Sequence, residues 1–459
     1  MKQCGRRWLT LIAVTIMTGG MAMAQTDTTQ QLGLRDAVSI ALEHNQQLIN
    51  ARLNVRQADA QVQEAWGYAL PALDFQGQYT RALKKPVFYL PAEFLGGKPT
   101  DPPAAVRVGS DHSINLALNA RQTLFNASVI TGVGASRTYA RAAREAMDAS
   151  RLEVVTNVRK AYYRVLLAKE ARAMMRANLR NAEENLHNVQ LLSKQGLVSE
   201  YDQLRADVGV ENLRPAVIQA DNNYQLAIDA LRIAMGVEES VKFVVADSLT
   251  YEPVPEELLT NVMEQTTEGN LNLRAMRTQI EISKAFVRVE QANYLPSLSA
   301  FGNYTYQVAK NTFNISPRDL IASSQVGLVL TMNIFQGLQT NARVEQAEVN
   351  VRKTEEQVSS LETNLKTAAN SAVLRLREAQ LRIGAQGKTV AQAERGYRIA
   401  TTRFVSGSGT QLEVNDAQLA LTQARVNKMQ AIYDYLVAAA DLDMTLGRIP
   451  DYVPDVQDE

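Results

Sequence analysis

The sequence offers few side chains that could act in catalysis or bind a metal ion. Its three histidines, His44, His112 and His187, are predicted on three separate elements and form no H-x-x-x-H pair. Its single cysteine, Cys4, cannot form an intrachain disulfide or a pair of thiolate ligands. The G-x-S-x-G, Walker and Rossmann spacings are absent as well. We therefore expect no enzyme, no cofactor and no metal site.

Carboxylates at the start of two predicted helices are the remaining candidates for chemistry. Glu413 and Asp416 lie three residues apart, so on a helix they share one face. Ser199-x-x-Asp202 and Thr410-x-x-Glu413 also resemble capping boxes, in which a carboxylate satisfies the first turn of a helix. For Asp202 and Glu413, capping and a functional role are both open. Asp416 lies one turn further in, where capping does not explain it.

The composition is that of an exported, folded protein. The 459 residues carry 48 basic and 48 acidic side chains, which excludes a nucleic-acid binder built on bulk positive charge. Residues 1–24 combine a positive start, an apolar run from Trp8 to Met17 and an Ala22-Met23-Ala24 cleavage site, which is the pattern of a secretory signal peptide. No later stretch is apolar enough for a membrane-spanning helix, so a membrane role has to use strands.

The rest of the chain contains an internal repeat. Asn45 and Leu70-Pro71 recur as Asn270 and Leu295-Pro296, and the spacing from asparagine to proline is 26 residues in both copies. The predicted organisation is a signal peptide (1–24), repeat 1 (25–236), an equatorial linker (237–255), repeat 2 (256–447) and a C-terminal tail (448–459). We expect the linker and the tail to form a small girdle around the middle of the molecule.

Each repeat is predicted to contain a helix, two strands, a long helix and a shorter helix. The opening helix of repeat 1 is expected from about Arg35 to Ala69, because the following Leu-Pro ends it. The long helices, about 129–194 and 339–404, would be roughly 100 Å long. They carry heptads, which are typical of knobs-into-holes packing and would also suit a simple coiled-coil stalk. The shorter helices are expected over about 201–235 and 412–446.

Two hairpins, at 73–125 and 297–335, are predicted from residues that alternate between apolar and polar. The period of two persists for about ten residues, enough for a tilted strand to cross a hydrocarbon layer. The first hairpin holds an insertion from Lys84 to Ala105, whose prolines and glycines predict a loop. The apolar positions are Leu73, Phe75, Gly77, Tyr79, Ile114, Leu116, Leu118, Leu298, Ala300, Gly302, Tyr304, Tyr306, Val326, Leu328, Leu330, Met332 and Ile334.

Four strands from one chain cannot close a membrane barrel, and open sheet edges are not tolerated in lipid. A barrel must therefore be shared between subunits, and a homotrimer would supply twelve strands around a lumen. Two soluble hairpins packed on each other remain the alternative. The fold class that we predict is mainly α with transmembrane β, in which a trimeric twelve-stranded barrel continues into long helical rods. The resemblance given next implies that these rods form a periplasmic α-helical barrel.

This layout resembles the TolC-type outer-membrane efflux channels over nearly the whole mature chain. The resemblance depends on the N-x-x-L and Leu-Pro spacing, both hairpins and the paired G-x-x-[ST] turns that end the long helices. It implies a homotrimer in outer-membrane lipid, with most of the chain in the periplasm. It also implies that the trimer docks through a periplasmic adaptor, or membrane fusion protein, onto an inner-membrane pump that selects the cargo for export.

The family's functional residues lie at the periplasmic tip. By position, Glu413 and Asp416 match its paired acids, and three subunits would set six carboxylates around one constriction that draws cations. Asp202 and Phe404 match a clamp position and an aromatic position, and Arg205 is a candidate partner for an acidic neighbour. The turns that would meet the adaptor contain Gly196, Leu197, Val198, Ser199, Gly407, Ser408, Gly409 and Thr410.

This chain departs from the family pattern at two tip positions. The family's best-known member has an arginine where this chain has Gly409, and a tyrosine where it has Phe404. Asp202 is therefore expected to lack a charged partner, and a closed-state latch would need other contacts.

A periplasmic coiled-coil adaptor or structural scaffold is the alternative function. Such adaptors usually have one helical hairpin flanked by β-rich domains, whereas this chain has two hairpin sets and no flanking β-domain. A soluble exported monomer would favour the adaptor, and heat-sensitive trimers in the outer-membrane fraction would favour the channel.

Overall fold

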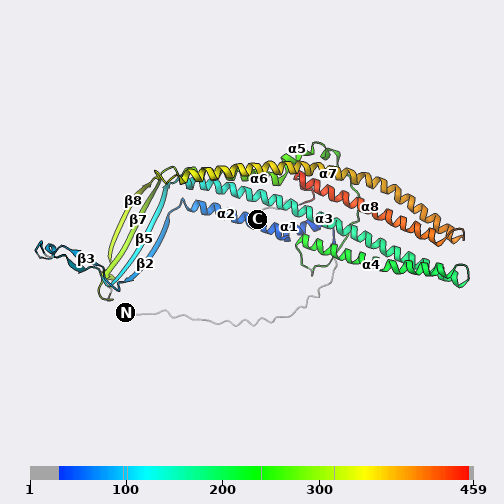
Figure 1. Cartoon of the computed structure of the whole chain (residues 1–459), viewed down its shortest axis with the longest axis horizontal. Coiled ribbons are helices and arrows are strands. Elements are labelled where there is room, and N and C mark those ends of the chain that lie inside the picture. Colours follow the sequence, from blue (N-terminus) through cyan, green and yellow to red (C-terminus); the bar gives the residue numbers. More distant parts are fainter. Residues whose placement is uncertain (1–29, 97, 101, 239, 315, 454–459) are drawn as a thin grey trace, which may run out of the picture.

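A computed structural model describes residues 30–96, 98–100, 102–238, 240–314 and 316–453. The predicted signal peptide and the last six residues of the predicted tail lie outside these ranges. The molecule is an elongated rod, with a β-sheet at one end and the turns of two helical hairpins at the other (Figure 1).

Two long helices and their shorter partners form the rod. Helix α3 (Ala127–Lys194) packs against α4 (Glu200–Met235), and α7 (Gln339–Val405) packs against α8 (Gln411–Leu446). These bounds agree with the predicted helices to within two residues. Helices α2 (Gln46–Gly67) and α6 (Leu271–Ala292) lie along the half of the rod nearer the sheet (Figure 1). Among the residues described, no helix is both long and apolar enough to cross a membrane.

The sheet has four antiparallel strands in the order β2-β5-β7-β8. The strands are β2 (Ala72–Arg81), β5 (His112–Phe125), β7 (Ser297–Lys310) and β8 (Ile321–Thr331). Their register gives the sheet two chemically different faces, because residues paired directly across strands point to the same side. One apolar row is Leu73, Ala120, Gly302 and Val326, and the adjacent row on the other face is Asp74, Asn119, Asn303 and Gln325.

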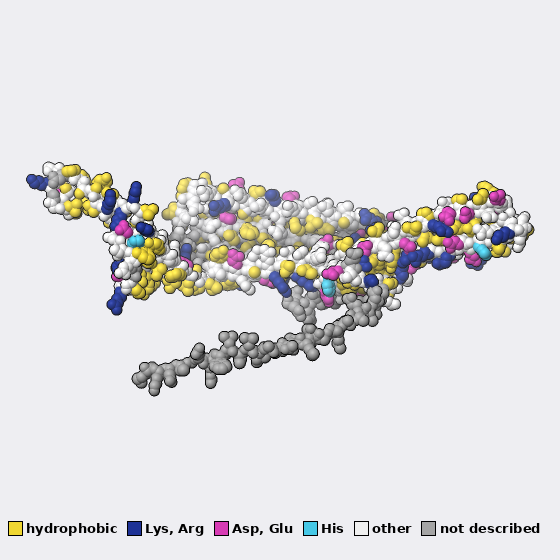
Figure 2. All heavy atoms as spheres, turned by 90° about the horizontal axis from the view of Figure 1, so that it is seen from below, with side chains coloured by type: hydrophobic (Ala, Val, Ile, Leu, Met, Phe, Trp, Pro, Cys, Tyr) yellow, Lys and Arg dark blue, Asp and Glu magenta, His cyan; other side chains and the backbone are white. Residues whose placement is uncertain are grey.

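The apolar face of the sheet is exposed in the single chain. Phe75 is 69% exposed, Val326 89% and Leu330 70%. Figure 2 shows hydrophobic side chains gathered at the sheet end of the molecule, whereas charged side chains are dense toward the helical tips. This contiguous apolar surface is far larger than the single apolar side chains that a soluble monomer usually exposes. It therefore indicates contact with lipid or with another chain.

Two strand predictions are wrong in detail. The expected loop from Lys84 to Ala105 contains a second small hairpin, in which β3 (Val87–Leu90) pairs with β4 (Ala104–Arg107) and a 3-10 turn, η1 (Ala92–Leu95), follows β3. The prolines of this segment lie outside the two strands, where no ladder N–H is needed. The last strand is also shorter than expected, because β8 ends at Thr331 and leaves Met332 and Ile334 outside it.

The opening helix is broken at Asn45, contrary to the single helix that was expected. Helix α1 (Leu34–His44) ends there, and the Asn45 side chain caps α2 by accepting from the N–H groups of Gln47 and Leu48. The same side chain donates to the carbonyl of Ala234, in the last turn of α4, at 2.8 Å. The interruption therefore fastens the start of α2 to the end of α4.

The second half of the chain repeats this arrangement. Helix α5 (Val262–Gly269) ends at Asn270, which caps α6 through the N–H of Leu273 and donates to the carbonyl of Thr445 at 2.9 Å. The helix ends approach so closely that a Cβ atom on Gly447 would lie 2.0 Å from the carbonyl oxygen of Gly269. We call these two contacts, at Asn45 and Asn270, the asparagine clamps.

Two apolar clusters fill the middle of the rod. One joins α1, α3 and α4 to the parallel pair of β1 (Gln30–Leu32) and β6 (Phe243–Val245), and the other joins α5, α7 and α8. Tyr162 is buried in the first cluster, and its hydroxyl donates to Asp247 at 2.6 Å. Burial, with this hydrogen bond, raises the pKa of Tyr162. The predicted linker packs against the rod, where the N–H of Val254 donates to the hydroxyl of Tyr435 on α8 at 2.7 Å. The short 3-10 turn η2 (Glu256–Leu259) follows Val254 in the chain.

The asparagine clamps predict a specific loss of stability. Asn45→Ala removes a helix cap and a partly buried hydrogen bond, so the free energy of unfolding should fall by about 1–2 kcal/mol. Asn45→Asp keeps the cap acceptor but sets a carboxylate against the Ala234 carbonyl, so it should also lower the melting temperature measured by circular dichroism. Asn54→Ala, on the exposed face of α2, is the control and should not lower it. Equal melting of Asn45→Ala and Asn54→Ala would contradict the clamp.

Candidate functional site

The two helical hairpins end in turns that lie together at the end of the rod far from the sheet (Figure 1). The first turn joins α3 to α4 through residues 195–199, and the second joins α7 to α8 through 406–410. Gly196 and Gly407 have φ of 71° and 73°, a conformation that favours glycine, and each follows the end of a long helix. Leu197, Ser199, Ser408 and Thr410 are exposed, whereas Val198 is half-buried.

Asp202 acts as a helix cap in the single chain. Its carboxylate accepts from the N–H of Ser199 at 3.2 Å and from the Ser199 hydroxyl at 2.6 Å, while that hydroxyl accepts from the N–H of Asp202. Within the described chain Asp202 has no cationic partner, and Arg205 pairs with no acid. Phe404 is half-buried in the last turn of α7.

Glu413 and Asp416 lie in different surroundings although they belong to one helix. The Thr410 hydroxyl accepts from the N–H of Glu413 at 3.3 Å, so Thr410 caps α8. The Glu413 carboxylate turns toward α7, where its buried Oε2 lies 3.2 Å from Nη1 of Arg403. Asp416 is exposed and forms no hydrogen bond or ion pair with the described residues.

Arg403 is a tip residue that the sequence patterns did not reveal. Its Nη2 donates to the carbonyl of Ser408 at 3.0 Å, and its own carbonyl accepts from the N–H groups of Ser408 and Gly409. A Cβ atom on Gly409 would lie 3.0 Å from the Arg403 Cβ and 3.1 Å from Glu413 Oε2. This turn therefore has little room for a side chain at position 409. The one available signal was a cation in the last turn of a helix, where the helix dipole favours it.

Polar contacts hold the helices together behind the tips. Asn178 on α3 is 8% exposed and donates to the hydroxyl of Thr422 on α8 at 3.1 Å. Asp221 on α4 accepts from Arg172 and Arg176 on α3, and these hydrogen bonds lower the pKa of the Asp221 carboxyl. Such pairs add to the buried apolar contacts between the helices, and the narrow apolar stripe suits walls that are wetted on both sides.

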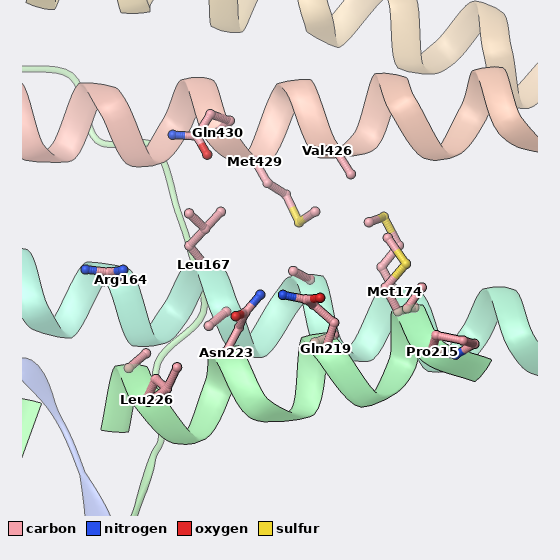
Figure 3. A pocket seen from close by; sticks show the side chains of 16 residues that line it. Arg164, Leu167, Met174, Pro215, Gln219, Asn223, Leu226, Val426, Met429 and Gln430 are labelled. Carbon is pink, nitrogen blue, oxygen red and sulfur yellow. The ribbon is translucent and has the colours of Figure 1, made fainter. Parts of the chain in front are cut away.

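A groove of about 700 Å³ opens between α3, α4 and α8, nearer the middle of the rod (Figure 3). Its lining is mainly apolar, with Leu167, Met174 and Met429 directed into it and Pro215 at one end. Arg164 is the one charged residue among those that line it. Across the described ranges, no three or more His, Cys, Asp and Glu side chains gather in a way that could hold a metal ion.

The comparisons of the sequence and of the structure with known proteins agree on one family. The sequence model described as "Outer membrane efflux protein" matches residues 37–237 and 262–448. The outer membrane protein TolC of Vibrio cholerae is 24% identical over 358 residues, which cover 75% of this chain and 78% of that protein.

Solved structures show the same fold at low sequence identity. The CmeC outer membrane channel of Campylobacter jejuni superposes with a TM-score of 0.74 at 19% identity, covering 90% of this chain and 85% of that one. The open state of the MtrE outer membrane channel of Neisseria gonorrhoeae gives 0.72 at 20% identity, covering 90% and 89%.

The crowding at Gly409 predicts a local effect of a small substitution. Gly409→Ala must displace Arg403 or the backbone of Phe404 by a few tenths of an ångström, so the turn should open more often. Trypsin should then cleave after Arg403 faster than in the unsubstituted protein. The matched control is Gly387→Ala in the middle of α7, where a Cβ meets no atom within 4 Å and should leave cleavage unchanged. Equal cleavage of the two variants would show that the turn has room at position 409.

Proposed function

Because this chain belongs to the outer membrane efflux protein family, we propose that three copies of it form a continuous duct across the outer membrane and the periplasm. The protein is an outer-membrane export channel that works in a tripartite pump, with a large helical part in the periplasm. The alternative of a periplasmic adaptor or scaffold loses its support with this family membership.

The two open edges of the four-stranded sheet carry the proposal. Strands β2 and β8 each pair on one side only, and the sheet has one apolar face. In lipid, every backbone N–H and C=O needs a partner, so a sheet with free edges must close on itself or on other copies. Four strands are too few to surround a lumen, whereas three copies give twelve. Adjacent copies would pair β8 with β2 in the antiparallel sense that alternation requires.

The two faces of the sheet assign the inside and the outside of this barrel. The face with Leu73 and Val326 would contact acyl chains, and the face with Asp74 and Asn303 would line water. Asn119 links the polar row by accepting from Asn303 and donating to Asp74 at 2.8 Å. A wetted, hydrogen-bonded row of this kind suits a passage for polar cargo.

The tip would form the gate and the docking surface. Asp416, exposed and without a partner, would line the periplasmic constriction, and Phe404 would pack near it. Asp202 would add a carboxylate on the other tip helix, and Arg205 would meet an acid of a neighbouring copy. The exposed turns at 195–199 and 406–410 would contact the helical hairpin of a periplasmic adaptor, which links the channel to an inner-membrane pump.

The division into two repeats is part of the same proposal. Both asparagine clamps join a capped helix start to the end of a helix that follows a tip, at Asn45 with Ala234 and at Asn270 with Thr445. This correspondence supports duplication of one unit of helices and hairpin. Three copies would then give a wall of six similar units.

Cysteine cross-linking tests the shared barrel. The single cysteine of the sequence, Cys4, lies within the predicted signal peptide. Once that peptide is removed, cross-links can form only between introduced cysteines. Gln76→Cys in β2 would be combined with single cysteines along β8, from Ser323 to Val329. One or two of these pairs should give covalent trimers under oxidation in isolated outer membranes, because β8 of each copy abuts β2 of the next. Each single variant is the control and should stay uncross-linked. Intramolecular bonds only, or no bond at any β8 position, would refute the trimer.

A further inference from the structure

We infer that Arg403 withdraws Glu413 from the ring of carboxylates at the tip, so that Asp416 alone supplies the accessible acids of the constriction. This inference rests on the proposed channel function and refines its gate. A trimer would then present three accessible carboxylates at this ring, in place of the six expected from the sequence.

The direction of the Glu413 carboxylate is the first observation. Its Oε2 is buried although the side chain as a whole is 41% exposed, so that oxygen points into the turn and not into solvent. It would lie 3.1 Å from a Cβ atom on Gly409, and it lies 3.2 Å from the Arg403 guanidinium. The missing side chain at position 409 leaves the space that the carboxylate occupies.

The second observation is that the turn holds both the guanidinium and the backbone of Arg403. Its Nη2 donates to the Ser408 carbonyl at 3.0 Å, and its main-chain carbonyl accepts from Ser408 at 2.9 Å and Gly409 at 3.0 Å. Exposed ion pairs are usually weak because both side chains must be ordered. Here the hydrogen bond to the Ser408 carbonyl already restrains the guanidinium, so the pair with Glu413 costs less additional freedom.

Asp416 provides the contrast on the same helix. It is exposed, one turn further along α8, and has no partner among the described residues. A multivalent cation that enters the constriction would therefore meet an unpaired Asp416 carboxylate and a Glu413 carboxylate that already faces Arg403. Arg403 is thus a positioning residue that sets the charge of the ring.

Carboxyl labelling tests the pairing without any assumption about transport. The native channel in detergent would be treated with a water-soluble carbodiimide and glycinamide, and labelling quantified by mass spectrometry. Asp416 should label several-fold faster than Glu413, and Arg403→Gln should raise labelling of Glu413 toward that of Asp416. Lys194→Gln, which removes a cation from the last turn of α3, is the control and should leave Glu413 protected. Equal labelling of Glu413 and Asp416 in the native channel would overturn the inference.

Block of single channels by hexaamminecobalt(III) in planar bilayers tests the consequence. Asp416→Asn should raise the half-blocking concentration by about tenfold, because it removes the accessible ring. Arg403→Gln should lower it by about fivefold, and Lys194→Gln by less. Glu413→Gln should weaken block much more in the Arg403→Gln background than alone. Equal weakening in both backgrounds would overturn the inference. If Asp416→Asn leaves the half-blocking concentration unchanged while Glu413 stays protected from labelling, the proposed gate is rejected and the pairing of Arg403 with Glu413 stands.

Discussion

A sheet that one chain cannot complete is the constraint on which the rest of this structure depends. The hydrogen-bonding groups along the outer sides of β2 and β8 need partners, and the apolar face between them cannot remain in water. Both requirements are met together when copies of the chain close a barrel in a membrane. The number of strands, the alternation of side chains and the export signal in the sequence all become intelligible from this one requirement.

The helical rod connects the sheet at one end of the molecule to the tips at the other end. Each long helix starts directly from the sheet end and runs to a tip, so the geometry of the barrel sets the spacing of the helices. The asparagine clamps fix where the shorter helices end, since each joins a helix start at the middle of the rod to the end of a helix that returns from a tip. Polar pairs such as Arg172 with Asp221 join the helices outside the apolar clusters. In the proposed trimer, these helices would form a tube wall that is wetted on both faces.

Long-range periodicity made most of the fold predictable from the sequence. Heptads indicated the long helices, whose predicted bounds hold to within two residues, because this periodicity depends only on which face of a helix is buried. The break at Asn45 was missed, since helical spacing continues across it. An asparagine cap before Leu48 was the signal, but its cause is a contact with Ala234, far away in the sequence. The β3–β4 hairpin was missed because its prolines flank the strands without interrupting them.

At the tip, the sequence identified the candidate residues but not their pairing. Resemblance and spacing selected Glu413 and Asp416 together, since both positions share one helix face. Their difference arises from a turn in which Gly409 leaves space for the Glu413 carboxylate and Arg403 pairs with that carboxylate. That contact depends on the path of the backbone between α7 and α8, which no periodic pattern encodes. A charge count made from sequence alone is therefore unreliable at such a turn.

The number of chains in one native particle tests the central claim most directly. Native mass spectrometry of the mature protein, released from detergent micelles, should give three chains and no smaller stable species. A lone chain that stays monodisperse after complete removal of detergent would contradict the account, because its sheet edges and its apolar face would then need neither lipid nor a second copy.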